Sequence, residues 1–279
     1  MKAAVIILLS ALSALFLAFF LLLFLMKPSK RRPGVEKFKG LKYAHRGLWG
    51  EGCPENSLSA HRRAADSGYA IELDVRLSRD GVAVVFHDDT LDRMTKLTGR
   101  VDSLTAEELS KALLLDTDEG IPTFKDVLSA VGGRVALLIE LKGRDLSVAD
   151  RVKEALSDYS FDFIIESFNP RILARVKKIM PSAIRGILSE GYMADRKTRT
   201  LPHFFLEWML LNFLSRPDVI AYRHTDGNNL PLRLIRRLYG TDTVAWTVRS
   251  ESEEQAARQN GFDAVVFEKY LPKEKNYEI

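Results

Sequence analysis

The sequence has very little cysteine, and this excludes several classes of protein. Cys53 is the single cysteine among 279 residues, so neither an internal disulfide nor a zinc site built from several cysteines is possible. No Gly-x-Gly-x-x-Gly motif follows the first predicted strand, and no segment repeats at a fixed spacing. The missing glycine motif argues against a doubly wound dinucleotide-binding fold.

Excess positive charge is confined to the N-terminal part of the chain. The formal net charge is +4, but residues 27–42 hold seven Lys or Arg and one Glu, and Lys2 adds one more positive charge. Residues 43–279 therefore carry a net charge of −3. A mildly acidic folded part argues against nucleic acid as a partner.

An apolar run without any charge covers residues 3–26. About 20 apolar residues suffice to cross the hydrocarbon layer, so we expect residues 1–26 to form a transmembrane anchor; a cleaved signal peptide is the alternative. Four basic residues follow the run and only Lys2 precedes it. The positive-inside rule then places the following domain on the cytoplasmic side of the cell membrane. Residues 27–40 would form a basic linker that either contacts anionic lipid head groups or is a solvated spacer.

Eight short apolar segments alternate with helical patterns over the rest of the chain. The expected strands are 42–45, 70–74, 135–141, 162–167, 183–188, 218–222, 243–248 and 263–267. The helical patterns between them are 56–67, 123–131, 148–158, 170–179, 230–238 and 252–260. This alternation predicts an α/β fold with a parallel sheet. Eight units predict a TIM barrel, over residues 41–274, with 88–120 as an insertion after the second strand; a doubly wound sheet is the alternative.

Polar side chains gather at the ends of the predicted strands, which is where a TIM barrel carries its active site. Three consecutive strands end with charges at a spacing of two residues, a pattern that isolated surface charge would not produce. The polar residues at these ends are His45, Arg46, Glu72, Asp74, Glu140, Lys142, Glu166, Ser167, Trp246 and Thr247.

The stretch 71–89, IELDVRLSRDGVAVVFHDD, predicts a hairpin with a turn at Asp80-Gly81. A two-residue turn of this type puts His87 opposite Asp74, with Cβ atoms about 5 Å apart. A bulged three-residue turn would shift that register by one residue.

Three carboxylates are expected to meet at this rim, from Glu72, Asp74 and Glu140. Oxygen ligands at this density of negative charge favour one hard divalent cation, Mg²⁺ or Ca²⁺. Structural ion pairs with Arg46 and Lys142 are the alternative.

Two histidines and two cations complete the candidate chemistry. His45 and His87 can act as general base and general acid, while Arg46 and Lys142 can hold an anion. Together with a divalent ion, this set suits phosphoryl transfer at a phosphodiester.

Several motifs, in this order and spacing, resemble the glycerophosphodiester phosphodiesterase family over about residues 41–271. They are YAHRG, CPENSLSAHRRA, IELDVRLSRDGVAVVFHDD, IPTFKDVLSAV, LLIELKG, VAWTV and NGFDAVVFE. Two departures stand out: Ser57 replaces the usual Thr, and Glu268 lies where the family typically has Asp.

The resemblance implies a TIM barrel that hydrolyses glycerophosphodiesters to glycerol 3-phosphate and an alcohol with a bound metal. It assigns catalysis to His45 and His87, and metal binding to Glu72, Asp74 and Glu140. Substrate contacts fall on the remaining matched positions, Arg46, Lys142, Glu55, Asn56 and Trp246.

The stretch 201–216, LPHFFLEWMLLNFLSR, is too short to span a bilayer. It is either an interfacial helix beside the anchor or a helix buried against the barrel. Together with the anchor, it leaves a lysophospholipase D acting on lysophospholipids as an alternative function. A non-catalytic, membrane-bound lipid-binding module is a further alternative, although such a protein would be expected to have lost one of the groups named above.

Overall fold

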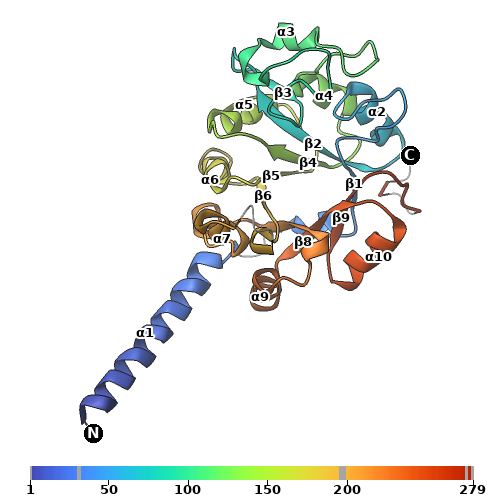
Figure 1. Cartoon of the computed structure of the whole chain (residues 1–279). Coiled ribbons are helices and arrows are strands. Elements are labelled where there is room, and N and C mark those ends of the chain that lie inside the picture. Colours follow the sequence, from blue (N-terminus) through green and yellow to red (C-terminus); the bar gives the residue numbers. More distant parts are fainter. Residues whose placement is uncertain (1, 30–32, 195–198, 274–275, 278–279) are drawn as a thin grey trace.

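A closed barrel of eight parallel strands, ringed by helices, forms the body of the molecule in the computed structural model (Figure 1). The structure describes residues 2–29, 33–194, 199–273 and 276–277. The predicted anchor, linker and barrel also include residues 1, 30–32, 195–198 and 274, which lie outside the described residues.

The barrel strands follow one another in the order β1-β9-β8-β7-β6-β5-β4-β2, and a pairing of β1 with β2 closes the ring. The prediction of a TIM barrel is confirmed, and each of the eight expected strands is present with slightly different ends. They are β1 (Lys42–Ala44), β2 (Ala70–Leu77), β4 (Leu137–Leu141), β5 (Phe163–Ser167), β6 (Ile184–Ser189), β7 (Val219–Arg223), β8 (Asp242–Val248) and β9 (Ala264–Phe267).

Helices surround the barrel, and several begin at a side chain that caps their first turn. The Ser57 and Thr123 hydroxyls accept bonds from backbone N–H groups at the starts of α2 and α4. The helices are α1 (Lys2–Met26), α2 (Leu58–Asp66), α3 (Ala106–Ser110), α4 (Phe124–Val131), α5 (Ser147–Ala155), α6 (Pro170–Ile179), α7 (Leu201–Glu207), α8 (Asn212–Ser215), α9 (Leu230–Tyr239) and α10 (Glu251–Gln259). Short 3₁₀ turns are η1 (Val35–Phe38), η2 (Val101–Ser103), η3 (Tyr192–Ala194) and η4 (His224–Asp226).

The inside of the barrel is a packed core, because every second strand residue points inward. Its lining includes Ala136, Leu138 and Ile164, all buried. Val35 and Phe38 of η1 belong to the same cluster. Since η1 directly precedes β1, these two side chains cover the amino end of the barrel. This part of the predicted linker is therefore attached to the barrel rather than forming a solvated spacer.

The hairpin after β2 has a different turn from the one expected. Ser78 N–H bonds to the Val82 carbonyl at 3.0 Å, and Gly81 has φ of 75°. The turn thus has three residues and a left-handed glycine. As a result, β3 (Ala83–Val85) pairs with β2 one residue out of the expected register, and the Asp74 carbonyl accepts a bond from Phe86 N–H at 2.9 Å. The prediction that His87 lies directly opposite Asp74 is wrong.

Residues 88–120 form an extension beside β3 with a small core of its own. Leu91, Met94, Leu109 and Leu114 are buried there. Helix α3 begins with a capping box, in which Thr105 and Glu108 cap each other's backbone. This extension lies next to β3 and α4, at the opposite end of the molecule from α1 (Figure 1).

The stretch 201–216 is broken into two helices rather than one. Met209, with φ of 50°, separates α7 from α8. Met209 and Leu210 are buried in the core outside β6 and β7, whereas Leu201 and Phe205 are exposed. The second half of this stretch is therefore buried against the barrel, as one of the two readings expected, while its first half is exposed and contact of that half with a membrane stays a prediction.

We predict that Gly47→Ala destabilises the fold more than Gly52→Ala does. Both glycines have positive φ, so both substitutions strain the backbone. Only at Gly47 would a new Cβ lie 2.8 Å from the Ala60 backbone of α2. Thermal unfolding should show a lower midpoint for Gly47→Ala than for Gly52→Ala. We expect the two variants to differ by about 1–3 kcal/mol in the free energy of unfolding. Equal midpoints would contradict the close packing of this loop on α2.

Candidate active site

Three buried carboxylates meet at the carboxyl ends of β2 and β4. One oxygen from each of Glu72, Asp74 and Glu140 lies within 4.8 Å of the others. The register explains this proximity, because Asp74 and Glu140 are direct partners across β2 and β4, and Glu72 points to the same side as Asp74. Three oxygen donors at this spacing fit a hard divalent cation.

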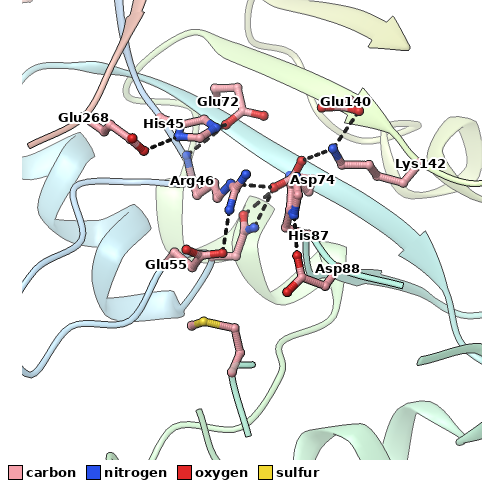
Figure 2. A network of polar contacts seen from close by, with 12 residues as sticks. His45, Arg46, Glu55, Glu72, Asp74, His87, Asp88, Glu140, Lys142 and Glu268 are labelled. Atoms are coloured by element: carbon pink, nitrogen blue, oxygen red, sulfur yellow. Dashed lines mark hydrogen bonds and ion pairs between the residues drawn. The ribbon is translucent and has the colours of Figure 1, made fainter. Parts of the chain in front are cut away.

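Two cations lie against the carboxylates (Figure 2). Lys142 Nζ is 3.0 Å from Asp74 and 2.7 Å from Glu140. The Arg46 side chain is 3.4 Å from Asp74, and its backbone N–H donates to Glu72 at 2.9 Å. The predicted ion pairs and the predicted carboxylate cluster are thus both present, and they share the same residues.

The neighbouring positive charges act more strongly on Asp74 than on Glu72 and Glu140. Burial, together with Asp74 and Glu140, raises the pKa of Glu72 well above its usual range. Burial also raises the pKa of Glu140, although Lys142 opposes it. For Asp74 burial is outweighed by Lys142, His87 and Arg46, so its pKa is lowered. An additional positive charge at this point would stabilise the ionised forms of Glu72 and Glu140.

His45 lies at the end of β1 and is held by a carboxylate from the last strand. Its Nδ1 is 2.7 Å from Glu268, and Glu268 also accepts a bond from Arg249 at 2.6 Å. These two contacts outweigh the effect of burial and lower the pKa of Glu268 to about 2. An ionised Glu268 accepts a hydrogen bond from His45 Nδ1–H. The other ring nitrogen, Nε2, lies 4.0 Å from Glu72 and is then free to accept a proton.

His87 is held in the same manner from the other side. Its Nδ1 is 2.6 Å from Asp88, and Asp88 in turn accepts a bond from Arg93 at 2.6 Å. The shifted hairpin register does not remove His87 from the cluster, because Arg76 holds the His87 carbonyl at 2.6 and 2.8 Å. Figure 2 shows His87 beside Asp74. Burial is the first cause that lowers the pKa of both His45 and His87, and the neighbouring carboxylates oppose it.

Glu55 and Asn56 orient the groups that face the cluster. Glu55 accepts bonds from Arg46 at 2.7 Å and from Arg93 at 2.6 Å. Asn56 donates to Asp74 at 2.8 Å. Arg46 and Asn56 both have φ of 58°, so the loop after β1 is curled in a conformation that costs energy and brings these groups inward.

Trp246 and Glu166 lie on other parts of the same rim. Trp246 comes from β8 and packs edge-on against Phe168, with ring centroids 5.5 Å apart. Glu166, at the end of β5, is buried beside Glu140, and burial raises its pKa well above its usual range. Ser167 points away from the rim, because its hydroxyl donates to the Leu141 carbonyl at 2.7 Å.

An open cleft lies beside the cluster, and Lys142 is the cluster residue that lines it. It has a volume of about 890 Å³ and extends from Lys142 between the β2–β3 hairpin and the start of α5. Arg76, Arg79 and Arg144 are among its lining residues.

Sequence reasoning missed three residues of this site: Asp88, Arg93 and Arg249. Asp88 directly follows His87, so an acidic neighbour was a visible signal for it. Arg93 and Arg249 are exposed arginines of loops, and no sequence pattern distinguishes them from others. Glu268 was singled out only as a departure from the family, and the structure shows its contact with His45.

Comparison with known proteins identifies the family of this chain. The sequence profile of the glycerophosphoryl diester phosphodiesterase family matches residues 45–270. The Bacillus subtilis protein YhdW is 32% identical over 239 residues, which cover 80% of this chain and 92% of YhdW. A protein of Caldanaerobacter subterraneus named glycerophosphodiester phosphodiesterase is 37% identical over 166 residues, covering 54% of this chain and 67% of that protein.

Solved structures share the fold. A glycerophosphodiester phosphodiesterase of Thermotoga maritima is 26% identical, with a TM-score of 0.62, and the match covers 81% of this chain and 93% of that one. An Oleispira antarctica phosphodiesterase, in complex with its product sn-glycerol-3-phosphate, has a TM-score of 0.67 at 24% identity and matches over 83% of this chain and 94% of its own. Since the profile match runs from the histidine at the end of β1 to just beyond β9, this chain belongs to the glycerophosphoryl diester phosphodiesterase family.

Proposed function

We propose that this enzyme hydrolyses glycerophosphodiesters to glycerol 3-phosphate and an alcohol, with one divalent cation and the His45–His87 pair. The observation that carries the proposal is the convergence of three buried carboxylates, two cations and two carboxylate-held histidines at one end of the barrel. Membership of the family supports the same reaction.

Arg46 and Lys142 are the groups that would hold the phosphate. Each already faces carboxylates, so each is positioned by ion pairs from one side. Arginine suits two oxygens of a phosphate, and lysine acts as a point charge. Trp246 and Phe168 offer an apolar wall across the rim for the carbon skeleton of the substrate.

The two histidines would move the protons. One Nε2 accepts the proton of the nucleophile that attacks phosphorus, and the other ring donates a proton to the oxygen of the departing alcohol as the P–O bond breaks. The carboxylates of Glu268 and Asp88 keep each ring in one orientation and stabilise its charged form.

Glu72, Asp74 and Glu140 would hold the divalent cation, Mg²⁺ or Ca²⁺. Once bound, such an ion supplies positive charge that stabilises the phosphoryl oxygens in the transition state. The raised pKa values of Glu72 and Glu140 support this assignment, because these buried carboxylates lack sufficient positive charge around them.

We further propose that α1 anchors the enzyme in the cell membrane, with the barrel on the cytoplasmic side. Helix α1 is long and apolar enough to cross a bilayer. The four basic residues that follow it outnumber the single one before it, and this asymmetry favours the cytoplasm.

A second candidate substrate is a lysophospholipid, from which the same chemistry would release an alcohol and lysophosphatidate. The exposed apolar residues Leu201 and Phe205 of α7, which follows β6 at the rim, favour it.

Full-length enzyme in detergent or nanodiscs should be assayed for glycerol 3-phosphate release from glycerophosphocholine and glycerophosphoethanolamine, with Mg²⁺, Ca²⁺ or EDTA. Lysophosphatidylcholine is tested alongside these two substrates, for release of lysophosphatidate. Activity on lysophosphatidylcholine alone would favour the second candidate, and no activity on any of the three substrates would contradict the proposal.

Glu72→Gln is expected to reduce strongly the effect of divalent ions on both stability and activity. The neutral amide removes one anionic ligand and also part of the repulsion within the cluster. In EDTA the variant should unfold at or above the midpoint of the native enzyme. At about 100 times the dissociation constant, an ion should stabilise the native enzyme by about 2.7 kcal/mol and the variant by much less. Glu51→Gln, at an exposed glutamate, is the control, and equal stabilisation of all three proteins would exclude Glu72 as a ligand.

His45→Ala and His87→Ala should each lower turnover by about 10²-fold or more, because each removes one proton-transfer group. Circular dichroism and the unfolding midpoint should remain close to the native values, since both rings lie at the rim and not in the core. Steady-state kinetics on glycerophosphocholine provides the test. Near-native turnover of either variant would refute the acid–base assignment.

Glu268→Gln should lower kcat by about tenfold while leaving KM nearly unchanged, because Glu268 acts on the substrate only through His45. Glu268→Asp keeps the charge and is expected to retain more activity than the amide. Glu251→Gln, at an exposed position of α10, is the control. A rise in KM without a change in kcat would show that Glu268 contacts the substrate instead.

A further inference from the structure

Large exposed apolar side chains are concentrated on two of the helices that ring the barrel. Among the described residues of those helices, only α7 and α9 carry them. Leu201 and Leu230 are 71% and 52% exposed, and Phe205 and Leu238 are 36% and 49% exposed. Exposed apolar residues that are scattered singly need no explanation, whereas a group of them on one side of a molecule marks a contact with another apolar phase.

Helix α9 has two different faces. Leu232 and Ile235 are fully buried against the barrel. The opposite stripe, at helical spacing, combines Leu230 and Leu238 with the exposed arginines Arg233 and Arg237. The helix has no acidic residue, and neither of these arginines forms an ion pair with any residue that the structure describes. An outward face of leucine and arginine is the pattern of a helix that lies in a membrane interface.

The end of α1 is fixed to the barrel between these two helices (Figure 1). The Tyr239 hydroxyl, at the end of α9, donates to the Leu23 carbonyl at 2.8 Å. From α8, the Asn212 amide donates to the Met26 carbonyl at 2.9 Å. Met26 is only 2% exposed, and Phe204 of α7 packs against the same apolar cluster.

The length of α1 agrees with this arrangement. Residues 2–21 are exposed, and burial against the barrel begins at Leu22. The exposed part is about 30 Å long at 1.5 Å per residue, which matches the hydrocarbon thickness of a bilayer. A membrane crossed by this part of α1 would end where the barrel begins. The outward face of α9 and the apolar side of α7 are then at the level of the lipid head groups.

We propose that the outward faces of α7 and α9 form a membrane-contact surface, defined by Leu201, Phe205, Leu230, Arg233, Arg237 and Leu238, which rests on an anionic lipid bilayer. The proposal rests on the proposed function only in taking α1 as a membrane span. The leucines and Phe205 enter the boundary between head groups and acyl chains, and the arginines contact lipid phosphates.

This contact brings the membrane close to the active-site rim on one side. Helix α7 is tied to the segment that follows β6, since Ser189 Oγ donates to the Leu206 carbonyl at 3.0 Å and Tyr192 stacks on His203 at 5.1 Å. The substrate class that benefits is a phosphodiester carrying an acyl chain, such as a lysophospholipid. Its head group could reach the rim while the chain remains near α7.

The test places a polarity-sensitive fluorophore at single cysteines in the full-length Cys53→Ser enzyme, reconstituted in nanodiscs that contain anionic lipid. Labels at Leu201, Phe205, Leu230 and Leu238 should be quenched by lipids with bromine near the head of the acyl chain. Leu113, which is 46% exposed on the extension far from α1, is the matched control and should not be quenched. Leu12, in the middle of α1, is measured with lipids that carry bromine near the end of the acyl chain, and it reports the membrane span itself.

Two outcomes would overturn the proposal. If the label at Leu12 is quenched but the labels on α7 and α9 are quenched no more than the label at Leu113, the contact surface is wrong and the anchor stands. Absence of quenching at Leu12 would overturn the membrane span and the contact surface with it. Activity on glycerophosphocholine is measured separately and bears on neither outcome.

A charge reversal tests the role of the arginines. Arg233→Glu/Arg237→Glu should lose quenching at Leu230 and Leu238 in anionic nanodiscs, and the difference from native enzyme should shrink in neutral lipid. Arg62→Glu/Lys125→Glu, at exposed positions of α2 and α4, changes the net charge equally and should have no effect. Equal quenching in both double variants would contradict electrostatic contact with lipid.

Discussion

The mutual repulsion of Glu72, Asp74 and Glu140 is the constraint around which the rim of this barrel is organised. Burying one carboxylate is unfavourable, and burying three within 4.8 Å requires opposing charge. The structure supplies it from two sides, through Lys142, directly after β4, and through the loop after β1. That loop accepts left-handed conformations at Arg46 and Asn56 in order to face the carboxylates. Gly47, which approaches α2 closely, belongs to the same loop.

The fold and the acidic cluster could be predicted from the sequence, because both follow from patterns that repeat over a few residues. Buried strands appear as apolar runs, and a spacing of two residues places Glu72 and Asp74 on the same side of β2. In a parallel barrel the carboxyl ends of neighbouring strands meet, so Glu140 could be assigned to the same cluster before its position was known. The order of strands around the barrel then follows the order along the chain.

Features that depend on one turn or on tertiary packing could not be predicted. Asp80-Gly81 fits a two-residue turn as well as the three-residue turn that forms, and only the paired strands select between them. The partners Glu268 and Asp88 of the two histidines depend on side-chain orientation at strand ends. The break at Met209 is also set by tertiary packing, because the second half of 201–216 is drawn into the core beside β6.

The closure of the barrel floor by Val35 and Phe38 has a practical consequence. These residues belong to the segment that connects α1 to β1, so the same segment links the barrel to α1 and covers the amino end of the barrel. A water-soluble form that starts at β1 would leave the inner ends of the strands, among them Ala136 and Ile164, open to solvent. Soluble forms of the enzyme should therefore begin no later than Pro33, because such forms lack the apolar helix but keep Val35 and Phe38 over the amino end of the barrel.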